Sequence, residues 1–466
     1  MCIKFICTAR HGLLAAAIAF GSSMSCMLPA YADQDVTKYG AKGDGLTDDS
    51  DAIQKAINAA AADKSNNRVV FPDGEYLYTK PIIANGVMLL GSWVSAQLVS
   101  GNVGASIVLS GEKPVVSYLT FKTKAPGGSA IQCKNASFPR ITNSLFEKGF
   151  SKDIDAQNWR SGSIDGNTFK ISDFGQGISG SEMGSVWISK NVLFGDSESS
   201  VGMTIDLSVD CKVQGNMLKL VKNGMLLSSS RRCEVIDNQV IDSGVGLGIT
   251  GGIQCSCTRN WIDVKTAGVI LSVCQEVVVD TNTIKAGQSG ILGKGGQSCA
   301  IKNNNVTAGR VGVAFERARN LQVENNYIHD MPGLGLEIRN GVTAMITRNT
   351  IFSVGNVGVL ISDTSDSSLV KNRIYETQQQ GIYELNCSGT DRIEDNKLGS
   401  CGRKVKDPAA VIFVDSPKAA NIPVLRNDYV AAQRNLKYFI WTIQTPPTVN
   451  LSGNTTDTLL PNKTGR

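Results

Sequence analysis

Apolar positions along the chain follow a short repeat. An Asn followed two residues later by an apolar or aromatic residue recurs between residues 143 and 396 at intervals of 22 to 25 residues. These positions are Asn143, Asn167, Asn191, Asn216, Asn238, Asn260, Asn282, Asn304, Asn326, Asn349, Asn372 and Asn396. Eight to eleven residues after most of them, a Gly opens an alternating apolar run such as Gly312-Val313-Ala314-Phe315. Intervals this regular indicate a repeat architecture.

The chemistry of each unit favours strands. Its Val, Ile and Leu residues alternate with period two between Gly and Asn, which is typical of strand-turn-strand units and unlike the 3.6-residue period of helical repeats. The leucine-rich repeat signature is absent. We therefore predict an all-β fold, a parallel β-helix whose coils pair about 4.8 Å apart. Asn tolerates tight bends, and Asn residues stacked on successive coils can form a side-chain amide ladder.

Residues before the repeats have a different pattern. Asp48, Asp49 and Ser50 precede apolar residues spaced as on one face of a helix, namely Ala52, Ile53, Ala56, Ile57 and Ala60. Such a helix would cover the first coil, whose core and strand edges are otherwise exposed. We predict a cap and first coil over residues 33–91, a β-helix over 92–455 and a tail over 456–466.

The segment VTKYGAKGDGLTDDS at residues 36–50, together with the helix pattern after it, resembles the opening of the pectate-lyase-like superfamily. This group includes rhamnogalacturonases, polygalacturonases, alginate C5-epimerases and phage tailspikes. The resemblance implies a right-handed parallel β-helix with an N-terminal capping helix and a polysaccharide partner. In this family the motif is found on enzymes that catalyse different reactions. We therefore interpret Asp44, Asp48 and Asp49 as turn and capping residues and not as catalytic residues.

The first 32 residues have the pattern of an export signal. Lys4 and Arg10 precede a short apolar run, and Ala30-Tyr31-Ala32 is a cleavage site of small residues. We expect cleavage after Ala32 and a secreted or periplasmic protein. Removal of the two cations would leave a net charge of +3 instead of +5. A nearly neutral chain without a basic stripe argues against nucleic acid, and no apolar stretch approaches the length of a membrane span.

Several Cys residues share the repeat register. Cys211, Cys233, Cys255 and Cys299 each lie five residues before the Asn of their coil, so they should stack at one site. We predict a column of interior thiols, although neighbouring coils would also bring Cys pairs within disulfide reach. Only one His, His329, follows the signal, and no zinc-ligand spacing is present. His329 is interpreted as a surface turn residue.

Candidate chemistry lies on the outer face of the strands. If the first and third residues after each Gly point inward, the second and fourth point outward. The fourth positions are Asp206, Ser228, Thr250, Ser272, Lys294, Glu316, Arg339 and Ser362, and the second positions include Ala314, Glu337, Leu360 and Tyr383. Charge is thus concentrated on a few coils. We predict Glu316, Glu337, Arg339 and Lys294 as catalytic residues, and Asp363, Tyr383, Glu384 and Arg317 as substrate-binding residues.

Two enzymatic mechanisms and one non-catalytic role fit this patch. In a lyase or C5-epimerase acting on an acidic polysaccharide, a cation such as Arg339 or Lys294 neutralises the uronate carboxylate while a base takes the C5 proton. In a glycoside hydrolase, Glu316 and Glu337 would flank the bond. Alternatively, the charges form a solvated ladder on a carbohydrate-binding or surface-structural solenoid.

The family's active-site motifs are missing from this chain. Asp-Pro-His of the epimerases, Gly-His-Gly of the polygalacturonases and Arg-x-Pro-x-x-Arg of the pectate lyases are absent. No family active-site residue is therefore transferred to this chain. The acid cluster of a pectate-lyase calcium site is not evident either, so we predict no cofactor and recognise no metal site, with calcium the one ion left open. The oligomeric state is left open.

Overall fold

The computed structural model describes residues 33–465 except 64, 93–94, 197–198, 406–409, 431–435, 444–448 and 458–459. The chain divides into two units, residues 1–32 and 33–466. The predicted export signal coincides with the first unit and lies outside the described residues.

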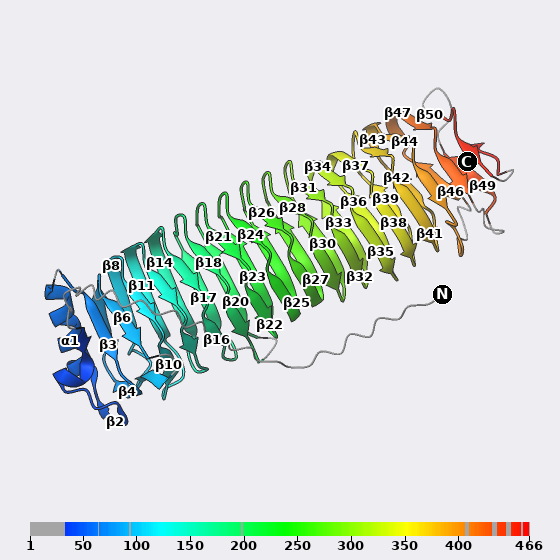
Figure 1. The fold of residues 1–466 in the computed structure, drawn as a ribbon. Coiled ribbons are helices and arrows are strands. Elements are labelled where there is room, and N and C mark those ends of the chain that lie inside the picture. The colour runs from blue at the N-terminus through cyan, green and yellow to red at the C-terminus, as the bar shows by residue number, and fades with distance from the viewer. Residues whose placement is uncertain are drawn as a thin grey trace, which may run out of the picture. The chain divides into compact units, whose positions relative to one another are not determined.

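The second unit is a parallel β-helix, as predicted (Figure 1). Each coil adds one short strand to a 19-stranded sheet and further strands to a 33-stranded sheet. The central coils consist of β27 (Trp261–Ser272), β28 (Val278–Asp280), β29 (Thr283–Ala286), β30 (Ser289–Lys294), β31 (Ala300–Lys302), β32 (Asn305–Ala308), β33 (Val311–Glu316), β34 (Arg319–Glu324), β35 (Tyr327–Met331), β36 (Leu334–Arg339) and β37 (Val342–Thr347). Pairing joins each strand to its equivalent one coil later, as β30 to β33 and β33 to β36.

Stacked Asn side chains form the predicted amide ladder. The side-chain amide of Asn260 donates to Oδ1 of Asn282 at 2.9 Å, and that of Asn282 donates to Oδ1 of Asn304 at 3.0 Å. The ladder continues to Asn427 and Asn454 beyond the regular repeats. Each amide also donates to a main-chain carbonyl of a neighbouring coil, as that of Asn282 does to Cys257 at 2.9 Å, so the ladder bonds the polar atoms of one buried corner.

One predicted member does not belong to the ladder. Asn143 is exposed with a φ of 50°, and its neighbour Ser144 occupies the ladder position, where its N–H donates to Oδ1 of Asn167 at 3.0 Å. The prediction for Asn143 was wrong by one residue. Asn143 instead occupies the left-handed turn position, which Asn adopts readily.

Helix α1 (Ser50–Ala62) covers the first coils, at the blue end of Figure 1. Ile53, Ala56 and Ile57 on its apolar face are buried, as the spacing predicted. Asp49 accepts from the N–H groups of Lys42 (2.7 Å) and Gly43 (3.0 Å), which holds the preceding turn against the helix start. Asp49 and Asp44 thus have the expected role in turns, since Asp44 accepts from the N–H groups of Leu46 and Thr47, whereas the Asp49 side chain makes no cap hydrogen bond to α1.

Thiols line the interior in register. Cys211, Cys233 and Cys255 are buried on successive coils, and Cys299 follows two coils later with Val277 between. All nine Cys of the described residues are free. Burial raises the pKa of Cys257 and Cys299, so these thiols pack as small apolar groups.

At the far end the sheet extends into the segment expected to be a tail. The aromatic strand β49 (Tyr438–Thr442) pairs with β52 (Lys463–Thr464). The ammonium group of Lys463 lies 3.7 Å from the centre of the Trp441 ring. This contact and the open edge of β49 explain why residues 463–464 remain in the sheet.

Candidate functional site

The predicted outward columns are confirmed by the register of the sheet. Lys294, Glu316 and Arg339 occupy equivalent positions on β30, β33 and β36, with Ser272 before them and Ser362 after. In the parallel column, Leu292, Ala314, Glu337, Leu360 and Tyr383 follow one another on successive coils. Counting from each Gly therefore identified which side chains share the outer face.

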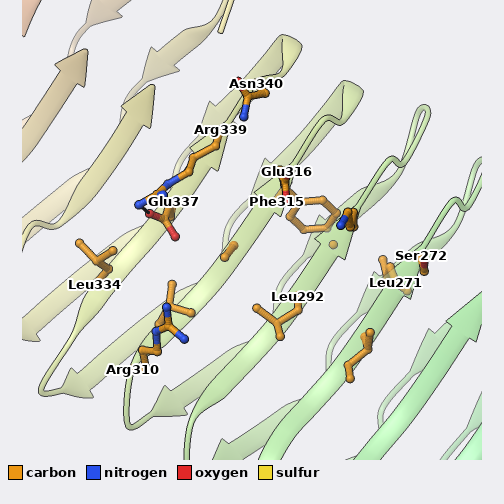
Figure 2. A pocket seen from close by; sticks show the side chains of 15 residues that line it. Leu271, Ser272, Leu292, Arg310, Phe315, Glu316, Leu334, Glu337, Arg339 and Asn340 are labelled. Carbon is orange, nitrogen blue, oxygen red and sulfur yellow. Dashed lines mark ion pairs between the residues drawn. The ribbon is translucent and has the colours of Figure 1, made fainter. Parts of the chain in front are cut away.

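A pocket of about 640 Å³ lies on this face (Figure 2). Its lining combines apolar side chains on four successive coils with five charged side chains. The lining residues are Ile270, Leu271, Ser272, Leu292, Gly293, Lys294, Arg310, Val311, Ala314, Phe315, Glu316, Leu334, Glu337, Arg339 and Asn340. All four residues predicted as catalytic belong to it. An apolar floor with a few polar groups around it is typical of ligand sites.

Both carboxylates of the pocket form ion pairs with arginines. Glu337 pairs with Arg339 along β36, and its side chain is 16% exposed against 54% for the arginine. Glu316 pairs with Arg317 at 3.1 Å, and both side chains are more open to solvent than that of Glu337. Arg339 is thus the more exposed partner of this ion pair, and it lines the pocket.

Arg310 is a pocket residue that sequence reasoning missed. It lies in the turn between β32 and β33, at the opposite end of the strand from Glu316 (Figure 2). The N–H of Arg310 donates to the carbonyl of Gln288 at 2.6 Å, which fixes the turn against the preceding coil. Thr266 and Gln288 precede it at the same place in earlier coils. Alignment of the turns, in addition to the strands, would have revealed this change to a cation.

The predicted substrate-binding residues are not brought together. Arg317 lies at the rim with Glu316. Asp363 is exposed in a turn with a φ of 52° and accepts from the Asn386 side chain. Tyr383 is half-buried two coils beyond Glu337, and its ring packs edge-on against Phe413 with centroids 5.1 Å apart. Asp363 and Tyr383 do not line the pocket.

Glu384, predicted to bind substrate, instead points into the coil. It is 1% exposed and lies between Ile361 and Val414 on the neighbouring coils. Burial, together with the nearby Asp391, raises the pKa of Glu384 well above its usual range. A carboxyl enclosed in this way cannot contact a polysaccharide on the outer face.

His329 is placed on another face of the coils. It belongs to strand β35 and not to a turn, and its ring stacks on Phe352 with centroids 5.4 Å apart. Its two ring nitrogens lie 2.8 Å from oxygens of Asp330 and Asn305. These contacts give the ring a packing role away from the pocket.

Comparison with known proteins gives two family matches. The model described as "Rhamnogalacturonase A/epimerase, pectate lyase-like" matches residues 34–247, and the model described as "Right handed beta helix region" matches residues 267–427. The first match contains the opening motif, and the second contains the pocket.

One curated protein matches a short segment of the chain, and two solved structures share its fold at low identity. The plasmin and fibronectin-binding protein A of Streptococcus pneumoniae is 55% identical over 42 residues, which are 9% of this chain and 6% of that protein. The structure of the S. pneumoniae surface protein and adhesin PfbA matches with a TM-score of 0.54 at 15% identity, over 66% of this chain and 100% of that one. Gene product 12 of bacteriophage phi29 in its pre-mature form matches with a TM-score of 0.55 at 12% identity, over 92% of this chain and 72% of that one.

Within the described residues, no helix has the length and apolar character needed to cross a membrane. The two family matches, the all-parallel coils and the capping helix agree with one another. The two matches confirm the resemblance to pectate-lyase-like right-handed β-helix proteins that the opening motif indicated.

Proposed function

We propose that this protein is exported and processes an acidic polysaccharide in the pocket over β30, β33 and β36, as a lyase or a C5-epimerase. The observation that carries the proposal is the composition of the pocket. Three cations, Lys294, Arg310 and Arg339, surround an apolar floor on the outer face. A sugar ring can pack on the floor while its carboxylate meets positive charge, which distinguishes uronates from neutral sugars.

The chemistry follows from the same groups. A uronate resists loss of its C5 proton because its carboxylate is already negative, so a neighbouring cation must first offset that charge. Arg339 and Lys294 are placed to supply this neutralisation. Glu316 and Glu337 are the pocket carboxyls that can take the proton or return one. Return of the proton to the opposite ring face gives epimerisation, whereas departure of the 4-oxygen gives chain cleavage.

Glycoside hydrolysis is the second candidate, and the spacing of two carboxylates favours it. Glu316 and Glu337 lie on paired strands, because Glu337 is opposite Ala314, two residues before Glu316. With strands about 4.8 Å apart and about 3.3 Å per residue, their Cα atoms are about 8 Å apart. Inverting hydrolases place their carboxyls about 6.5–9.5 Å apart.

A binding role without catalysis is the third candidate. The two pocket carboxylates are paired with arginines, as in a solvated charge ladder. The similar fold of an adhesin fits the same interpretation.

Incubation with a panel of uronate polymers in D₂O separates these candidates. Ultraviolet absorbance from unsaturated ends indicates a lyase, and deuterium at C5 without cleavage indicates an epimerase. Either result supports the proposal. New reducing ends without ultraviolet absorbance and without deuterium at C5 would replace it with hydrolysis, and binding with no product would replace it with a binding role.

Two matched arginine variants locate the activity. Arg339→Ala should lower kcat/KM about 10²-fold or more, the usual effect of removing one preorganised charged or hydrogen-bonding group. Arg232→Ala is the control, because Arg232 is similarly exposed and paired with Asp210 at 2.7 Å but does not line the pocket. Equal activity of the two variants would exclude this pocket as the site.

A further inference from the structure

The interior of the stack contains a carboxylate at a position that is apolar on neighbouring coils. Phe315, Ile338 and Ile361 precede Glu384 in one inward column, and Val414 follows it. Nothing in the pocket uses this side chain. An ionised carboxylate is costly to bury without a partner, so its presence here calls for a compensating group.

Two further ligand-type side chains meet Glu384. Cys387 and Asp391 come from the same coil, and one ligand atom of each of the three residues lies within 4.8 Å of the others. All three are at most 1% exposed. Within the part of the chain that the structure describes, this is the one group of three His, Cys, Asp or Glu side chains gathered so closely.

Hydrogen bonds leave most of the carboxyl oxygens of this group unused. Oδ2 of Asp391 and the oxygens of Glu384 are buried without a hydrogen bond of normal geometry, and the Ser416 side chain is the one polar neighbour that lowers the pKa of Glu384. Oδ1 of Asp391 accepts from the N–H of Ser367 at 2.7 Å, which orients the side chain toward the interior. The Sγ atom of Cys387 lies 3.2 Å from Oγ1 of Thr364. Unpaired buried oxygens facing a thiol are unusual in a folded core.

We propose that Glu384, Cys387 and Asp391 bind a divalent metal ion inside the β-helix, and that Zn²⁺ fits the donor set. Thiolate and carboxylate are both ordinary Zn²⁺ ligands, whereas Ca²⁺ takes six to eight oxygens and Mg²⁺ an octahedral oxygen shell. Tetrahedral Zn²⁺ would hold the ligand atoms about 3.3–3.8 Å apart, so the side chains must close by about 1 Å.

Metal binding is accompanied by release of protons from the ligands. The Cys387 thiol gives its proton to solvent as the S–metal bond forms, and each carboxyl releases any proton that it holds. No oxidation or reduction occurs.

The position of the site suggests its purpose. The following ladder step, from Asn396 to Asn427, spans 31 residues, compared with 22 to 25 in the regular coils. Around the site the short strands are broken into β43 (Ser388–Thr390) and β44 (Arg392–Glu394), both of which pair with β47 (Lys418–Leu425). A metal ion would fasten a coil whose strand pairing is interrupted.

Cobalt binding tests the ligand set. The full chain is freed of metal by a chelator and titrated with Co²⁺. We expect one equivalent to bind, with a thiolate-to-cobalt charge-transfer band in the near ultraviolet and release of protons in weak buffer. Cys387→Ser should lose the band. Cys401→Ser is the control, because Cys401 is an equally buried free thiol outside the group, and it should keep the band.

Thermal stability provides an independent readout. Zn²⁺ should raise the melting temperature of the metal-free protein as its concentration increases, because only the folded state offers the site. Glu384→Ile restores the apolar residue of the neighbouring coils, so this variant should fold and show no response to Zn²⁺. A wild-type protein without the cobalt band and without a Zn²⁺-dependent melting temperature would overturn the proposal in favour of two protonated carboxyls. A Zn²⁺ response retained in Glu384→Ile would overturn it as well.

Discussion

The amide ladder is the feature whose removal tests the fold most directly, and Asn282→Ala is the sharpest perturbation of it. The Asn282 side chain is 1% exposed. Its amide donates to Asn304 Oδ1 at 3.0 Å, to the Cys257 carbonyl at 2.9 Å and to the Asp280 carbonyl at 3.1 Å. Its Oδ1 accepts from both the main-chain and side-chain N–H groups of Asn260 at 2.9 Å.

The magnitude follows from the partners that survive. In Asn282→Ala, the Asn260 side chain keeps a bond to the Val235 carbonyl, and Asn304 Oδ1 keeps the main-chain N–H of residue 282. The main-chain N–H of Asn260 loses its acceptor and stays buried, which costs about 1–3 kcal/mol. The remaining lost hydrogen bonds contribute about 0.5–1.5 kcal/mol each. Four such bonds are lost, so we expect the free energy of unfolding to fall by at least about 3 kcal/mol.

Asn305→Ala is the matched control. Asn305 is exposed in the next coil, and its side chain contacts His329 Nε2 at 2.8 Å. Loss of this contact should change the free energy of unfolding by less than about 1 kcal/mol.

The assay combines guanidinium denaturation with hydrogen exchange. Long repeat arrays can unfold without full cooperativity, so the exchange rate of the Asn260 main-chain amide is the decisive measurement. That amide should exchange faster in Asn282→Ala and at the parental rate in Asn305→Ala. If the two variants unfold within about 1 kcal/mol of each other and the Asn260 amide stays protected in both, the ladder does not stabilise the stack as argued.

Three further predictions concern the packed interior. Burial raises the pKa of Asp153 well above its usual range, so the folded state binds the proton more tightly than the unfolded state and stability falls as pH rises from about 4. Asp153→Asn should therefore gain about 1–3 kcal/mol over the parent at pH 8 but little at pH 4, as measured by denaturation at both pH values. Gly290→Ala would place Cβ 2.4 Å from the carbonyl oxygen of Gly312, so it should lower the free energy of unfolding by at least about 2 kcal/mol. In the control Gly184→Ala, Cβ meets no atom closer than 3.9 Å, so this variant should keep the parental denaturation midpoint. Phe146→Ala removes the middle ring of a stack with centroids 4.7 and 4.8 Å apart and should lower the free energy of unfolding by about 3–5 kcal/mol, which a parental midpoint would contradict.

The sequence predicted the columns because the repeat length is nearly constant where they lie. Lys294 and Glu316 are 22 residues apart, and Arg339 follows after 23. Residues separated by one repeat length lie in the same column of the stack. Because side chains alternate between the two faces of a strand, the position counted from the Gly decides whether the column faces outward or inward. The prediction failed for Asn143 because Ser144 takes its place in the first step of the ladder. Where the preceding coil lacks the Asn, the pattern alone does not fix the register.

Glu384 shows a different source of error. It is the third residue after Gly381, and the parity rule places third residues inside the coil. Assigning it to the substrate gave more weight to its charge than to its position. Charged residues in a core are rare enough that the general expectation favours the surface. Here the register was the stronger indication, and the exception marks the interior group proposed to bind metal.

Arg310 and Asp391 limit what column counting can provide. Both lie outside the strands of the outer face, Arg310 in a turn and Asp391 immediately before a short strand of the other sheet. Their partners are residues of different columns, so their convergence depends on how each corner bends and not on the repeat length. A ligand site needs groups from several directions, whereas a column supplies them from one. The repeats therefore predict where chemistry can lie on the stack, and the corners determine which groups meet there.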